Sequence, residues 1–66
     1  MEVLLSEKAV RVADILERID AVNKMLQVHA DDEFMKSQYV YQKNLFLKEL
    51  VDSIGAFDIS LKDIAA

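Results

Sequence analysis

Apolar residues in the first half of the chain recur at alternating steps of four and three. The series runs Leu5, Ala9, Val12, Leu16, Ile19, Asn23, Leu26 and Ala30, with one polar member at Asn23. This spacing is a heptad seam, which keeps one side of an α-helix apolar. Ile15 and Val22 widen the seam on one side, as is typical of a helical bundle. The pattern therefore predicts a helix over about residues 6–29 with a large apolar face.

The sequence also indicates where this helix begins and which side of it faces solvent. Ser6 can cap the first turn, and Glu7 places a negative charge near the positive end of the helix. Acids precede bases by four residues on the opposite side, an orientation that favours a solvated helix surface. The pairs are Glu7 with Arg11, Asp14 with Arg18, and Asp20 with Lys24.

A polar segment from His29 to Glu33 interrupts the apolar pattern. Its aspartates suit the N-cap and first turn of a second helix, while His29 suits the negative end of the first. The segment predicts a tight turn over residues 30–32 and hence a helical hairpin. Because it contains neither Gly nor Pro, one uninterrupted helix through both halves is the alternative.

A second helix is predicted over about residues 32–54, and Gly55 is expected as the C′ residue that ends it. One broad side is apolar and is expected to pack on the first helix: Met35, Tyr39, Val40, Phe46, Leu47, Leu50, Val51 and Ile54. Phe34, Tyr41 and Leu45 project from roughly the opposite side. A lone hairpin has nothing to cover these three residues.

The tail over residues 56–66 has two interpretations. Phe57, Ile59 and Leu61 alternate with polar residues, which favours an extended segment folded back over the helices. Ser60 with Asp63 also resembles a loose capping box, which would open one last helical turn. Residues 1–66 together are interpreted as one helical-hairpin domain with this tail.

Composition adds a requirement for a partner surface. The chain has 66 residues, of which 53% are hydrophobic, and a domain this small buries only about 60% of its unfolded surface. Two helices therefore carry more apolar side chain than they can hide between themselves, and further protein is expected to cover it. The absence of Cys is consistent with a reducing, cytoplasmic setting.

Several classes of partner are not expected. The first residues show neither the basic start nor the long apolar run of a signal peptide, and no stretch reaches the ~20 apolar residues of a membrane span. The net charge is −4, and the Lys and Arg residues are interspersed with acids. A surface for membranes or nucleic acid is therefore not predicted.

Candidate chemistry is sparse. His29, Asp31, Asp32 and Glu33 are residue types that bind metals, but neighbours at a turn point in different directions, so capping is the expected role. The serines are expected at caps or on helix surfaces, without an activating base: Ser6, Ser37, Ser53 and Ser60. We expect no enzyme activity, no cofactor, no metal and no small-molecule substrate.

The stretch from Glu17 to Asn23 resembles the first helix of the all-helical chorismate mutases, which are also dimers. That family lines its pocket with several cationic side chains, including arginines further along the chain. This sequence has no Arg after Arg18. The resemblance is therefore confined to this helical stretch, and no site residue is carried over from it.

The sequence as a whole predicts an all-α, antiparallel two-helix hairpin that pairs with a second copy as a four-helix bundle. The expected function is non-enzymatic self-association, with a homodimer favoured and another protein partner possible. The expected interface comprises Leu5, Ala9, Val12, Ile15, Leu16, Ile19, Val22, Asn23, Leu26, Phe34, Tyr41 and Leu45. The alternative is a small regulatory partner, such as an inhibitor or antitoxin, that docks its C-terminal tail on a target as a strand.

Overall fold

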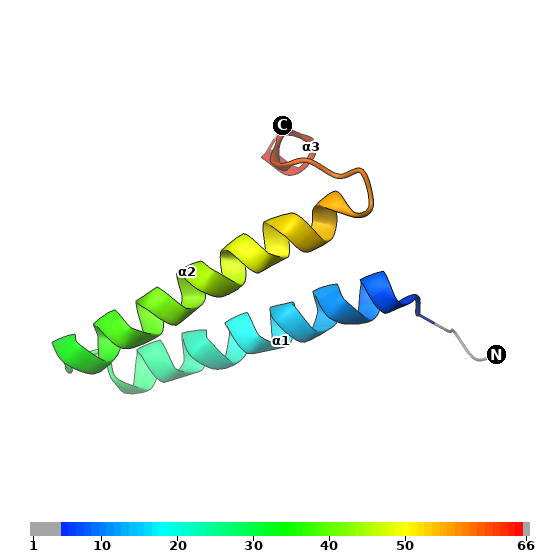
Figure 1. Cartoon of the computed structure of the whole chain (residues 1–66). Helices are drawn as coiled ribbons and strands as arrows, with labels where there is room; N and C mark the ends of the chain where they lie inside the picture. The colour runs from blue at the N-terminus through cyan, green and yellow to red at the C-terminus, as the bar shows by residue number, and fades with distance from the viewer. Residues whose placement is uncertain (1–4, 66) are drawn as a thin grey trace.

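The computed structural model describes residues 5–65 and contains two long helices and one short helix. They are α1 (Glu7–Val28), α2 (Glu33–Gly55) and α3 (Leu61–Ala65). In Figure 1, α1 and α2 run antiparallel, joined by a short turn, and α3 lies on the α2 side of the hairpin. The all-α hairpin expected from the periodicity is confirmed, and the single continuous helix is not formed.

Local side-chain hydrogen bonds set where both long helices begin. The Ala9 amide donates to Ser6 Oγ at 3.2 Å, and the Met35 amide donates to Asp32 Oδ1 at 3.1 Å. Each bond satisfies a backbone N–H that has no partner within the first helical turn. The N-cap predicted at Ser6 is confirmed, and Asp32 caps the second helix from the predicted turn.

The turn itself is closed by His29. Its amide donates to the Met25 carbonyl at 3.0 Å, and its carbonyl accepts from the Asp32 amide at 3.0 Å. The His29 ring also stacks on Tyr39 of α2, with centroids 5.6 Å apart and planes inclined by 18°. Backbone and ring contacts together hold the two helices side by side at this end.

The end of α2 differs from the prediction. Gly55 is still helical and has no positive φ, whereas Asp58 adopts a φ of 58°. The amides of Phe57 and Asp58 donate to the carbonyls of Ile54 and Gly55, both at 3.0 Å. The prediction that Gly55 is the C′ residue is wrong because the chain continues for another turn and reverses at Asp58. Aspartate is among the residues that tolerate this conformation.

The tail forms a short helix and not an extended strand. The Ser60 amide donates to Asp63 Oδ2 at 2.8 Å, and Ser60 Oγ lies 3.3 Å from the same oxygen. This is the capping arrangement that the spacing of these two residues allowed as the alternative. The preference for an extended segment was therefore wrong.

The hydrophobic core between the helices is thin. Ile15 and Val22 are 3% and 6% exposed, and they are the only buried apolar side chains among the residues whose burial is described. The molecule measures 43 × 31 × 18 Å, with a radius of gyration of 14.5 Å, against about 11 Å for a compact domain of this length. The hairpin is elongated because two helices enclose only a single line of side chains.

The outer side of α1 is polar, as the charge pattern predicts. Arg18 Nε lies 2.9 Å from Asp14 Oδ2, and Lys24 Nζ lies 3.1 Å from Asp20 Oδ2. Both pairs are more than half exposed, so each contributes only a few tenths of a kcal/mol. The expected pair of Glu7 with Arg11 does not form an ion pair.

Candidate functional site

The contact between the helices is centred on one edge of the predicted seam. Ile15 and Val22, expected at the edge of the seam, point directly into α2 and are buried. Leu16, expected at the centre of the seam, is 50% exposed. A rotation of α1 by less than one residue step of about 100° accounts for this difference.

The remaining interface candidates in α1 fall into two groups. Half-buried residues flank the buried pair: Ala9, Val12, Ile19, Asn23 and Leu26. Leu5 stands at the start of the described chain and is exposed, as is Leu16. The structure therefore places most of the predicted seam in or beside the helix contact and leaves one flank of it open.

The apolar side of α2 is also divided. Met35, Tyr39, Phe46, Leu50 and Ile54 are half-buried against α1. The expectation that Val40, Leu47 and Val51 pack on α1 is wrong, since each is about 40% exposed. These three residues lie beside the line of contact and not on it.

Phe34, Tyr41 and Leu45 remain exposed, as expected for a hairpin without a partner. We call these three residues the outer patch. Phe34 and Tyr41 have exposed fractions of 70% and 64%. Large apolar residues that stay this open on a small protein mark candidate interaction surfaces.

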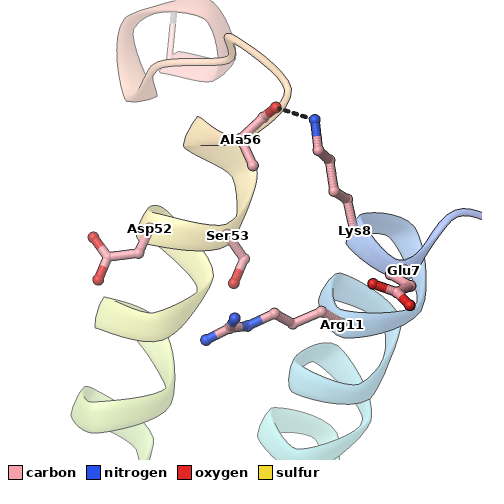
Figure 2. Close-up of a pocket in the computed structure, with 6 residues that line it drawn as sticks. All are labelled: Glu7, Lys8, Arg11, Asp52, Ser53 and Ala56. Atoms are coloured by element: carbon pink, nitrogen blue, oxygen red, sulfur yellow. Dashed lines mark hydrogen bonds between the residues drawn. The ribbon is translucent and has the colours of Figure 1, made fainter.

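A pocket of about 300 Å³ opens between the start of α1 and the end of α2. It is lined by Glu7, Lys8, Arg11, Asp52, Ser53 and Ala56. Figure 2 shows Lys8 reaching the Ala56 carbonyl oxygen, a hydrogen bond of 3.2 Å, and Arg11 extending from α1 toward α2. The pocket thus marks where the two helices separate at the open end of the hairpin.

Ser53 is the one polar side chain in this pocket that is buried. It is 7% exposed, and its Oγ has no hydrogen-bond partner. The prediction that Ser53 lies on a helix surface is therefore wrong. The signal was present in the spacing, because Ser53 follows Phe46 by seven residues and Leu50 by three, the heptad positions of the contact.

The charged side chains that line the pocket balance one another. Its two acids balance its two bases, so it has no net charge. No His lines the pocket to take a proton from Ser53, and Lys8 is already engaged with a backbone carbonyl. A hydroxyl without an adjacent base is a weak nucleophile.

Residues 5–65 hold neither a cluster of metal ligands nor a helix that could cross a membrane. This part of the chain contains no group of three or more His, Cys, Asp or Glu side chains arranged to hold a metal ion. Neither long helix has the run of apolar residues that a transmembrane segment requires, within the same range.

The chain matches no protein-family model, no curated protein and no solved structure.

Proposed function

We propose that this protein is a non-catalytic interaction module that self-associates, with two hairpins joining as a homodimeric four-helix bundle. The observation that carries this proposal is the shortage of core, since only Ile15 and Val22 are buried among the apolar residues described. A small domain with so thin a core and no Cys for disulfides gains stability from oligomerisation.

The exposed surface supports the same proposal. The chain exposes 5522 Å² at a mass of 7.5 kDa, whereas a compact monomer of this mass exposes about 4,200 Å². The excess of about 1,300 Å² exceeds the ~800 Å² that each partner buries in a standard stable interface. A second copy can therefore cover the surplus and leave an ordinary protein surface.

The exposed side chains are of the kind that interfaces bury. Thirteen large apolar residues are exposed in the described part of the chain, from Leu5 to Ile64. Burial of apolar surface contributes about 25 cal/mol per Å², so covering part of this set would add to the weak packing inside one hairpin. We further propose a reducing, cytoplasmic setting, which the cysteine-free sequence supports.

The proposal is tested by following helix content by circular dichroism during thermal unfolding over a hundredfold range of protein concentration. Folding coupled to dimerisation makes the melting temperature rise with concentration, because mass action favours the associated state. A melting temperature that does not move with concentration would contradict self-association in this range.

The second candidate, a regulatory partner that adds its tail to a target as a strand, has less support. Phe57 and Ile59 are about 40% exposed and could enter a foreign surface. However, residues Leu61–Ala65 are helical, and Ser60 is held in the cap of that helix. Strand addition would first have to break this turn.

A further inference from the structure

Each residue that contacts the other helix has one neighbour directly after it in the sequence and one directly before it. The residues directly after contact residues differ in character from those directly before them. In α2 the residues that directly follow a contact residue are mostly apolar, namely Val40, Leu47, Val51 and Ile54, with Lys36 as the polar exception. In α1 the apolar Leu16 is accompanied by Asp20, Asn23 and Gln27. The preceding residues are mostly polar: Asp14, Ala21, Gln38, Leu45, Glu49 and Asp52. The two sides of the contact line are therefore chemically distinct on α2, and Leu16 extends the apolar side onto α1.

Helix geometry places the apolar residues that directly follow contact residues, in α1 and in α2, on one side of the hairpin. One step along an α-helix is a rotation of about 100° in a fixed sense. Leu16 is rotated in this way from Ile15 in α1, and Leu47 from Phe46 in α2. Because α1 and α2 are antiparallel, the same rotation on each leads to the same side of the pair (Figure 1).

The pocket provides an independent check on this geometry. Arg11 and Asp52 precede contact positions, so the same argument puts both on the other side of the hairpin. They do line one pocket together, contributed by the two helices. The side opposite the pocket is thus formed by Leu16, Val40, Leu47 and Val51, which we call the shared apolar face.

We infer that the shared apolar face is where a second copy of this chain docks, with α1 of each copy lying on α2 of the other. This inference rests on the proposed self-association and specifies its surface and orientation. The face spans both helices, and its four members have exposed fractions between 39% and 50%. Two such faces stacked together enclose a continuous core between four helices.

Charge selects the orientation of the second copy. On this side α1 carries Asp20, which also pairs with Lys24 of its own helix, and α2 carries Lys36. The half-buried Lys43 lies at the edge between this side and the helix contact, and it has no ionic partner among residues 5–65. Placing α2 on the partner's α2 would bring lysines together. Placing α1 on the partner's α2 puts opposite charges together, and complementary charges of this kind fix orientation at an interface.

The register of the hairpin agrees with this pairing. Lys8 contacts Ala56 at one end and His29 stacks on Tyr39 at the other. Between these ends, Leu16 lies level with Leu47 and Asp20 with Lys43, to within about one helical turn. If the two copies are related by a two-fold axis parallel to the helices, each residue keeps its height along the helix axis. Leu16 then meets the partner's Leu47, and Asp20 the partner's Lys43.

The outer patch is the competing surface, and it is less suitable. Phe34, Tyr41 and Leu45 all belong to α2, and Lys48 and Asp52 lie among them. Docking there would leave the shared apolar face uncovered. A surface drawn from both helices hides more apolar area for the same interface size.

The first test compares Leu47→Glu with Tyr41→Glu, two substitutions by the same residue about 120° apart around α2. Dimer dissociation constants are measured by sedimentation equilibrium. Leu47→Glu should raise the dissociation constant at least about tenfold, whereas Tyr41→Glu should change it less than about threefold. The reverse ranking would overturn the face assignment while leaving self-association intact. A monomeric wild-type chain would instead overturn the proposed function.

The second test addresses orientation without changing any apolar residue, and it decides the matter if Leu47→Glu fails to fold. Asp20→Lys and Lys43→Glu are made separately, and the two proteins are mixed and examined by native mass spectrometry. Each variant alone opposes like charges at both inter-subunit pairs, whereas the mixed dimer restores opposite charges at both. We expect heterodimers to exceed the statistical half of all dimers.

A pair formed within one hairpin cannot produce this preference, because each variant keeps both of its charges in its own chain. Asp31→Lys, mixed with Lys43→Glu, is the control, since Asp31 lies in the turn beyond the shared apolar face. A statistical mixture of Asp20→Lys with Lys43→Glu would overturn the proposed orientation.

Discussion

Gly55 occupies a helical position at the end of α2, where a side chain would cost nothing sterically. It has no positive φ, and a Cβ added there would meet no atom within 4 Å. Glycine in a helix is less stable than alanine because it loses more backbone freedom on folding. Alanine at this position would therefore make the protein more stable than glycine does.

Gly55→Ala should raise the free energy of unfolding by about 0.5–1 kcal/mol, measured by urea denaturation. Ala13→Gly, at an exposed position within α1, is the matched control and should lower it by about 1 kcal/mol. If Gly55 were the left-handed cap that the sequence pattern suggests, Gly55→Ala would instead be destabilising.

Ser53 is the other residue whose environment is unusual, because its buried Oγ has no hydrogen-bond partner. Ser53→Ala removes an unsatisfied hydroxyl and improves helix propensity, so the free energy of unfolding should rise by about 1 kcal/mol. Chemical denaturation of wild type and variant measures the difference. Ser37→Ala, where the hydroxyl donates to the Phe34 carbonyl at 2.7 Å, should change stability less. A loss of stability in Ser53→Ala would show that the hydroxyl is bonded in solution.

At the scale of the helices, the N-cap residue Asp32 contributes to the stability of α2. Asp32→Ala removes the acceptor for the Met35 amide and should cost about 1 kcal/mol, read from thermal unfolding of the variant. Asp31→Ala removes a neighbouring carboxylate that caps no helix and should cost less than about 0.5 kcal/mol. Equal losses in the two variants would argue against the cap.

Helix positions and starts could be predicted from the sequence because they depend on neighbours within a few residues. Ser6 caps a backbone amide three residues ahead of it, and Asp32 does the same. The side of α1 that faces α2 could not be predicted with the same accuracy, because Ile15 and Leu16 are both large and apolar. Which of them faces α2 depends on the packing of the whole hairpin and not on local spacing.

The candidate surface could also be predicted only in part from the sequence. Exposure of Phe34 and Tyr41 followed from their position opposite the apolar side of α2. The exposure of Leu47 and Val51 was missed, since a broad apolar side does not indicate how much of it one neighbouring helix can cover. Only the antiparallel arrangement of α1 and α2 shows that these residues join Leu16 on a common face.

At the scale of the whole molecule, the hairpin is an open structure with one line of buried residues. Its two helices are held by Ile15, Val22 and their half-buried neighbours, and by the His29–Tyr39 stack at the turn. A second hairpin on the shared apolar face would turn this line into the centre of a bundle. Folding and association are then one event, so dissociated chains should lose helix.

Sedimentation equilibrium of the wild-type protein at micromolar concentration, with helix content measured on the same samples, tests this account most directly. We predict a species of twice the chain mass of 7.5 kDa, with helical signal that falls on dilution as monomer appears. A fully helical species that sediments as a single chain at these concentrations would contradict it.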